Sequence, residues 1–178
     1  MHSSKIQLNL YIRHYTLAIM ETKTNVMRIL DARHTPYKSY SYVGTGATSG
    51  DAVAAALHQN PAQVFKTLVT VARSGIHYVF MVPVCAELDL KRAAMAVGEK
   101  SINMLKSREL LGLTGYVHGG CSPIGMKKQF KTIADASAQN FATIIFSAGR
   151  IGYQVEVSPS DLEKLIPLDF ADVCVQQN

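Results

Sequence analysis

The sequence predicts an α+β fold, in which helices surround a curved sheet that is mixed and mostly antiparallel. Two observations favour this class. Helical and strand-like segments are interspersed along the chain, and strand pairs joined by short glycine turns outnumber strand–helix–strand units. The 178 residues are 48% hydrophobic and 17% charged, which is enough apolar material for the core of one domain.

The first part of the chain is expected to form a helix, a strand, a loop and a second helix. Apolar residues three and four apart predict the first helix, and alternation after Pro36 predicts the strand. Glycine, threonine and serine favour the loop, and four alanines favour the second helix. The expected ranges are 24–34, 37–43, 44–50 and 51–58.

The rest of the chain is expected to contain two hairpins separated by short helices and strands. Ser74-Gly75 joins the first hairpin and Ala148-Gly149-Arg150 the second, while Gly98 ends a helix. Ser158 is expected to cap a last helix, with Pro159 in its first turn and Asp161 at its third position. The remaining ranges are hairpin strands 66–73 and 76–84, helix 88–97, strand 101–105, helix 107–111, strand 115–117, and hairpin strands 142–147 and 152–157.

Met20 is a second plausible start of the chain. We therefore divide the sequence into an N-terminal extension, residues 1–23, and a domain, residues 24–178, with at least residues 1–19 dispensable. Loss of folding or activity on their deletion would contradict this interpretation.

Composition excludes several classes of protein. The longest apolar run, residues 78–86, is interrupted by Pro83 and is far shorter than the ~20 residues of a membrane helix. Three cysteines without a CxxC pair favour a reducing, cytoplasmic setting, and six histidines without ligand spacing predict no metal. Neither a GxGxxG nor a Walker pattern is present, so no cofactor is expected. A net charge of +5 permits an anionic partner such as RNA without requiring one.

Lys66 is the sole formal charge between Asn60 and Ala72, and it stands at the start of a predicted strand. A cation next to a buried strand is costly to desolvate, so it tends to be paired or directed at an anionic ligand. The alternative is a lysine whose stem follows the apolar surface while its ammonium reaches solvent.

A glycine-rich loop covers residues 115–125, with four glycines and one proline. Loops of this kind expose consecutive N–H groups that bind phosphates, carboxylates or oxyanions, although a simple tight turn is the alternative. His118 and Cys121 in this loop suggest a thiol–imidazole pair, but no third group to orient them is visible. The basic residues that follow could track a nucleic-acid backbone or form a solvated face: Lys127, Lys128 and Lys131.

Several short motifs in a fixed order carry a resemblance to a known family. They are Asn60-Pro61, Val64-Phe65-Lys66-Thr67-Leu68, Leu88-Asp89-Leu90-Lys91, Thr114-Gly115-Tyr116, Gly119-Gly120 with Ser122-Pro123 and Gly125, Phe141-Ala142-Thr143-Ile144, and Gly152 with Glu156. Over residues 28–172 this set resembles the YbaK/EbsC family of free-standing aminoacyl-tRNA editing domains, relatives of the editing insertion of bacterial prolyl-tRNA synthetase.

The resemblance implies an aminoacyl-tRNA deacylase that releases a wrong amino acid, chiefly from Cys-tRNA(Pro) and Cys-tRNA(Cys). It gives Lys66 the catalytic role and implies that a loop with Gly119, Gly120, Ser122 and Pro123 lines the substrate pocket. Tyr40 and Ser147 fall on two further substrate-binding positions. The implied partners are the acceptor end of aminoacyl-tRNA, met by Lys127, Lys128 and Lys131, and prolyl-tRNA synthetase, with no DNA or membrane partner.

Two positions depart from the family pattern. Ser49 stands where the family often has phenylalanine, and Gln154 stands where it usually has aspartate. Loss of a carboxylate changes the charge of the pocket and can change its choice of amino acid. The sequence therefore leaves open a deacylase for another aminoacyl group, such as alanine, or a tRNA- or synthetase-binding module without catalysis.

Overall fold

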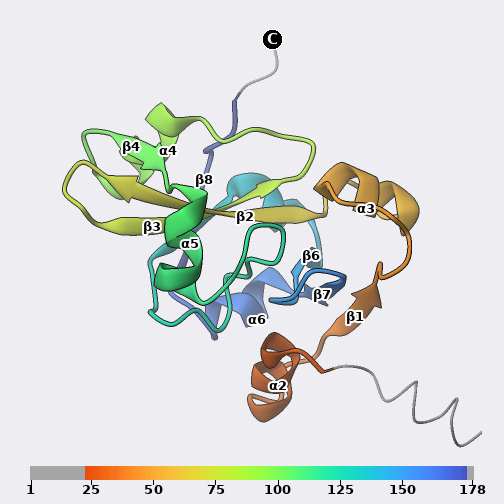
Figure 1. The fold of residues 1–178 in the computed structure, drawn as a ribbon. Coiled ribbons are helices and arrows are strands. Elements are labelled where there is room, and N and C mark those ends of the chain that lie inside the picture. Colours follow the sequence, from red (N-terminus) through yellow and green to blue (C-terminus); the bar gives the residue numbers. More distant parts are fainter. Residues whose placement is uncertain (1–22, 176–178) are drawn as a thin grey trace, which may run out of the picture.

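The computed structural model describes residues 23–175, so the expectation for residues 1–19 lies outside the described residues. The described chain forms two sheets and five α-helices (Figure 1). Four strand pairs are antiparallel and two are parallel, which confirms the mixed, mostly antiparallel α+β class. The strands divide into two separate sheets instead of one continuous curved sheet.

The larger sheet has five strands in the order β4-β2-β3-β5-β8. β2 and β3 form the predicted antiparallel hairpin, with Lys66 opposite Val82. β5 then pairs parallel with β3, and β8 pairs parallel with β5. The strands are β2 (Phe65–Ala72), β3 (His77–Pro83), β4 (Ile102–Met104), β5 (Thr132–Asp135) and β8 (Leu168–Ala171).

The smaller sheet has three antiparallel strands in the order β1-β7-β6. It contains β1 (Lys38–Ser41), β6 (Ile144–Ser147) and β7 (Tyr153–Val157). A parallel bridge between Val64 and Ile145 connects it to the residues just before β2. The start of β2 and the β6–β7 hairpin are therefore held side by side.

Four of the five α-helices of the described chain begin at residues whose side chains satisfy free N–H groups of the first turn, the exception being α5. Thr24 accepts from Met27 N, Ser49 from Ala52 N, Asp89 from Lys91 N and Arg92 N, and Ser158 from Asp161 N. Gly98 ends its helix in the left-handed conformation, as predicted. The helices are α2 (Asn25–Ala32), α3 (Gly50–Ala56), α4 (Leu90–Val97), α5 (Ser107–Thr114) and α6 (Pro159–Glu163), with a 3₁₀ helix η1 (Ala136–Asn140).

The two faces of the larger sheet support two hydrophobic cores. Phe80, Val82 and Ala93 belong to the core beneath α4. Val69, Met81 and Phe146 belong to a larger core that the five-stranded sheet shares with α2, β6, β7 and α6. A third, smaller cluster of Ala54, Val64, Val84 and Ile145 fixes α3 against the junction of the sheets.

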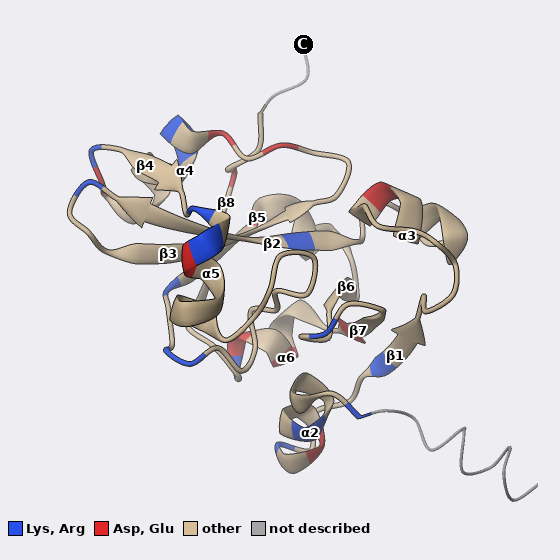
Figure 2. Cartoon of the chain, in the orientation of Figure 1, with Lys and Arg blue, Asp and Glu red and all other residues tan. Residues whose placement is uncertain are grey.

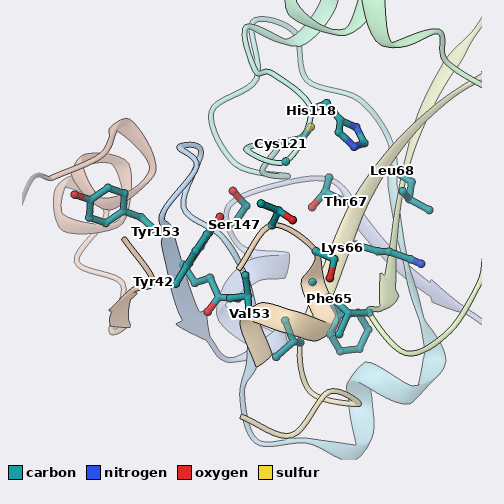
Figure 3. Close-up of a pocket in the computed structure, with 17 residues that line it drawn as sticks. Tyr42, Val53, Phe65, Lys66, Thr67, Leu68, His118, Cys121, Ser147 and Tyr153 are labelled. Atoms are coloured by element: carbon teal, nitrogen blue, oxygen red, sulfur yellow. The ribbon is translucent and has the colours of Figure 1, made fainter. Parts of the chain in front are cut away.

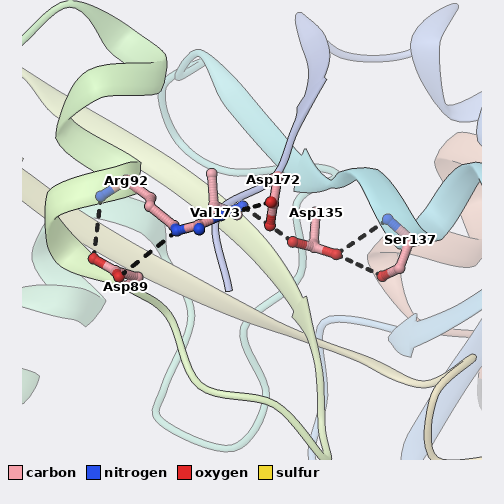
Figure 4. Close-up of polar contacts among 6 residues, drawn as sticks. All are labelled: Asp89, Arg92, Asp135, Ser137, Asp172 and Val173. Carbon is pink, nitrogen blue, oxygen red and sulfur yellow. Dashed lines mark hydrogen bonds and ion pairs between the residues drawn. The ribbon is translucent and has the colours of Figure 1, made fainter. Parts of the chain in front are cut away.

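The polar contacts of Figure 4 attach the C-terminal segment to the larger sheet. Asp135 Oδ2 accepts from Val173 N at 3.1 Å, and its Oδ1 accepts from Ser137 N and Oγ. Arg92 pairs with Asp172 at 2.5 Å. Burial raises the pKa of Asp135, but these hydrogen bonds outweigh burial and lower it overall.

The two hairpins, the helices and most boundaries agree with the prediction, whereas one strand does not. Residues 115–117 form no strand because α5 extends to Thr114 and Gly115 ends it in the left-handed conformation. β5, η1 and β8 were not predicted. None of the helices within residues 23–175 has the length and apolar character needed to cross a membrane.

Candidate functional site

A pocket of about 350 Å³ lies where the start of β2, the N-terminus of α3, the glycine-rich loop and the β6–β7 hairpin meet (Figure 3). This volume is at the lower end of the range for small-molecule sites. None of the described residues that line the pocket is a carboxylate. The lining residues are Tyr42, Thr48, Ser49, Gly50, Val53, Val64, Phe65, Lys66, Thr67, Leu68, Val84, His118, Gly119, Cys121, Ser147, Tyr153 and Gln154.

We call residues 65–68 of β2 the lysine wall of the pocket. Lys66 is the charged residue of β2, seen as the blue band on this strand in Figure 2. Its ammonium lies 2.9 Å from Glu87 Oε1, and its side chain is 29% exposed while that of Glu87 is 80% exposed. In Figure 3 the Lys66 side chain extends away from Tyr42 and Ser147. Since the partner is so exposed, this ion pair is weakly held and an anionic ligand can compete for the lysine.

Thr67 follows Lys66, and in Figure 3 its side chain does not follow that of Lys66 but points to a different side of the strand. Its hydroxyl oxygen is buried and has no hydrogen-bond partner among the described residues. Buried hydroxyls without a partner are uncommon because they lose hydration without compensation. Thr67 therefore adds an unused hydrogen-bonding group to the lining.

We call Ser147 and Gln154 the amide wall. They face each other across the β6–β7 hairpin, and Gln154 is also opposite Tyr40 of β1. Ser147 Oγ accepts from Gly149 N at 3.2 Å. Gln154 Oε1 accepts from Gln59 Nε2 at 3.0 Å. Both side chains thus present polar groups that are already oriented by neighbours.

Tyr40 lies beside the amide wall but does not line the pocket. Its hydroxyl donates to the buried Glu156, which also accepts from Thr143 and has Lys38 Nζ at 3.7 Å. Burial raises the pKa of Glu156, but the hydrogen bonds and the Lys38 charge outweigh burial and lower it overall. The same hydrogen bond and burial raise the pKa of Tyr40 to about 12. Tyr40 therefore supports the small sheet as a neutral donor.

The glycine-rich loop contributes His118, Gly119 and Cys121 to the pocket. Gly120 lies against the backbone of Ile151, where an added Cβ would be 3.2 Å from its nitrogen. Ser122 is fully buried, with its hydroxyl accepting from Ile124 N. Pro123 lines a different cavity, of about 250 Å³, together with Lys128. Of the four loop residues predicted to line the pocket, the structure thus puts Gly119 in its lining.

His118 and Cys121 both line the pocket, but within residues 23–175 no hydrogen bond joins them. Burial raises the pKa of the Cys121 thiol to about 12. The thiol is therefore protonated near neutral pH and is a poor nucleophile.

The three lysines after the loop have different surroundings. Lys127 donates to the carbonyl oxygens of Leu111 and Gly112 at the end of α5, at 3.4 Å each. Lys131 pairs with Asp169 at 3.0 Å. Lys128 makes no ion pair with any described residue. Lys128 is thus the member of this run that is best placed for an external anion.

The fold brings together around the pocket five residues that were predicted from the sequence: Lys66, Ser49, Gly119, Ser147 and Gln154. Tyr42, Tyr153, Thr48 and Thr67 also line the pocket, with Gln59 behind it, and none of the five was predicted as a site residue. Thr67 could have been predicted as a lining residue, because it directly follows Lys66 in the sequence. No local signal exists for Gln59, since its partner is 95 residues away. Among residues 23–175, no group of three or more His, Cys, Asp or Glu side chains could hold a metal ion.

Comparison with known proteins identifies a recognised domain, which covers the lining residues from Thr48 to Gln154. Residues 45–165 match the family described as the aminoacyl-tRNA editing domain. A protein of Enterococcus faecalis, provisionally named Cys-tRNA(Pro)/Cys-tRNA(Cys) deacylase EbsC, is 40% identical over 158 residues, which are 88% of this chain and 96% of that protein.

Solved structures share the fold. A protein provisionally described as a trans-editing enzyme for prolyl tRNA synthetase matches with a TM-score of 0.75 and 24% identity, over 85% of this chain and 95% of that one. The hypothetical protein APE2540 matches with a TM-score of 0.77 and 21% identity, over 84% of this chain and 99% of that one. At these identities the two structures are evidence for the fold alone.

Proposed function

The chain belongs to the family of aminoacyl-tRNA editing domains, and we propose that it is a trans-editing deacylase that removes cysteine from tRNA(Pro) and tRNA(Cys). The observation that carries this proposal is the small pocket with a lysine at its edge and no carboxylate among the described residues of its lining. An aminoacyl ester is already activated, so a positioned cation and a few hydrogen-bond donors are sufficient to promote its cleavage.

In the proposed complex the aminoacyl group occupies the pocket and the terminal adenosine remains outside. Lys66 exchanges Glu87 for the ester carbonyl or a phosphate of the terminal adenosine. Stabilisation of the developing oxyanion by one such donor lowers the activation free energy by about 3 kcal/mol. The glycine-rich loop shapes the pocket, with Gly119 and Cys121 in its lining.

The substrate supplies its own nucleophile when the amino acid is cysteine. The thiol first loses its proton to water; its sulfur attacks the ester carbonyl, a C–S bond forms, the C–O bond to the ribose breaks, and the ribose oxygen takes up a proton from water. The products are a thiolactone and uncharged tRNA. The raised pKa of Cys121 supports this route, because the enzyme thiol is a weak competitor as nucleophile.

The tRNA contacts and the setting complete the proposal. Lys128 contacts the phosphate backbone of the acceptor stem. Lys127 and Lys131, which flank Lys128 in the sequence, add positive charge. Prolyl-tRNA synthetase is the candidate partner for tRNA selection, and the cytoplasm is the compartment where charged tRNA is present.

Deacylation of purified Cys-tRNA(Pro) and Ala-tRNA(Pro) tests the proposal, with Lys66→Ala beside the wild type. We expect the wild type to release cysteine and Lys66→Ala to fold normally but lose about 100-fold or more in rate. Lys164→Ala is the matched control, since Lys164 is exposed, pairs with Asp161 and lies outside the pocket.

The other outcomes each replace part of the proposal. Full activity of Lys66→Ala would remove Lys66 from the reaction. Release of alanine but not cysteine would change the substrate. Binding of tRNA with no release of either amino acid would favour a binding module without catalysis.

A further inference from the structure

The side-chain amide of Gln59 lies behind the amide wall and contacts that of Gln154. The fold fixes the position of Gln59. Gln59 follows the last turn of α3, where its N–H donates to Ala54 O at 2.8 Å. His58, the residue before it, adopts a left-handed conformation with a φ of 53°, which turns the chain sharply out of the helix. Gln59 then reaches Gln154 of β7, and its Nε2 donates to Gln154 Oε1 at 3.0 Å.

This hydrogen bond determines which end of the Gln154 amide remains available. Its oxygen is occupied by Gln59, and its Nε2 has no hydrogen-bond partner within residues 23–175. Ser147, opposite Gln154, accepts from Gly149 N, and its hydroxyl donates to no residue within 23–175, so its hydrogen is available to a ligand. The amide wall therefore offers two donors to the pocket and suits a group that only accepts hydrogen bonds.

Lys66 and Ser147 come from different sheets, so the two walls can meet different parts of one substrate. We propose that Ser147 and Gln154 bind the side-chain sulfur of the substrate cysteine as its thiolate, and that Gln59 is a positioning residue that fixes the direction of the Gln154 amide. The proposal rests on the proposed deacylase function. Donors directed at an anionic sulfur favour the thiolate, which is the form that attacks the ester.

The other end of Gln59 supports a positioning role. Its Oε1 is buried and has no partner among the described residues. A buried acceptor without a partner lowers stability. If residue 59 served only to pack, an apolar side chain there would give a more stable fold. The arrangement is understandable if the Gln59 amide is needed to orient Gln154.

The test reverses the direction of the Gln154 amide by replacing the side-chain nitrogen of Gln59 with an oxygen. In Gln59→Glu the new carboxylate can only accept, so Gln154 donates to it and turns its own oxygen toward the pocket. We measure release of Cys from Cys-tRNA(Pro) between about pH 6 and 9, a range that spans the titration of a thiol. We expect a loss of about 10-fold to 100-fold near neutral pH and a shift of the rate profile to higher pH.

Three further variants separate positioning from folding and from net charge. Gln139→Glu adds the same charge at an exposed site outside the pocket and is expected to leave the profile unchanged. Gln154→Met removes the donor and is expected to reproduce the loss and the pH shift. Gln59→Met removes the orienting bond without reversing the amide, so a smaller loss is expected. Thermal unfolding of each variant identifies any that fail to fold.

The outcomes distinguish this proposal from the proposed function. If the wild type releases cysteine and Gln59→Glu and Gln154→Met keep the wild-type pH profile, whatever their rates, the sulfur-binding role is overturned while the deacylase function stands. If the folded wild type releases no cysteine, the deacylase function fails and this proposal fails with it.

Discussion

The two hairpins that form the pocket contribute to it in different ways. Both turn at a glycine with positive φ, 85° at Gly75 and 80° at Gly149. A Cβ on Gly75 would meet nothing within 4 Å, whereas on Gly149 it would lie 2.8 Å from Tyr116 Cε1 and 2.9 Å from Val26 Cγ2. The β2–β3 hairpin supplies Lys66 from the end far from its turn, and the β6–β7 hairpin supplies Ser147 and Gln154 next to its turn. Similar turns thus have different consequences, because tertiary packing surrounds one of them.

The largest effect on stability is expected from alanine at Gly149, and alanine at Gly75 provides the comparison. Gly149→Ala should lower the free energy of unfolding by about 3 kcal/mol, since it combines an unfavourable φ with overpacking against Tyr116 and Val26. Gly75→Ala has the φ penalty alone and should cost about 1 kcal/mol. Urea unfolding of both variants measures the difference. Equal losses would show that the packing around Gly149 contributes nothing beyond its backbone conformation.

The same contrast explains what the sequence could predict. Capping residues, alternation and glycine turns are local, so they identified both hairpins and most helices. β5 and β8 pair in parallel with strands far along the chain, and their four-residue segments show no clear alternation. The predicted strand at 115–117 was wrong because Gly115 ends α5.

The residues of the site likewise differ in whether local sequence or tertiary packing determines them. The place of Lys66 in the pocket lining could be predicted, because an isolated charge in an apolar segment is visible in the sequence. The orientation of Gln154 depends on Gln59, a contact that exists only after α3 has packed near the small sheet. Charge can therefore be predicted from a single segment, whereas the direction of an amide cannot.

A second prediction concerns the buried carboxylate that supports the amide wall. Glu156→Gln should lower the free energy of unfolding by about 2 kcal/mol near neutral pH, since hydrogen bonds to a charged acceptor become neutral. The pKa of Glu156 is lowered from 4.5 in the folded protein, so its charge stabilises the fold above that value, and this contribution disappears as pH falls through the folded pKa.

Denaturant unfolding at several pH values checks this prediction. The difference between the wild type and Glu156→Gln should be largest near neutral pH and should shrink below about pH 4.5, the ordinary pKa of the group. Asp51→Asn, at an exposed site in the first turn of α3, serves as the control for loss of one negative charge. A difference that grows on acidification would contradict the assigned direction of the pKa change.

The smallest effect is expected at the lysine wall, where the partner of Lys66 is exposed. Glu87→Gln removes an ion pair whose acidic side chain is 80% exposed, so the free energy of unfolding should change by less than about 1 kcal/mol. The variant also removes an anion that competes with substrate for Lys66. We expect its KM for Cys-tRNA(Pro) to fall by about threefold at low salt and the advantage to vanish at high salt.

The salt dependence separates a competing anion from a catalytic carboxylate. Glu163→Gln removes an exposed charge outside the pocket and should leave KM unchanged. A loss of kcat in Glu87→Gln at every salt concentration would mean that Glu87 takes part in the reaction, and both walls would then depend on a fixed polar partner. An improved KM with unchanged kcat would instead leave the lysine wall as the adjustable side of the pocket, since its ammonium can exchange partners while the Gln154 amide is held by Gln59.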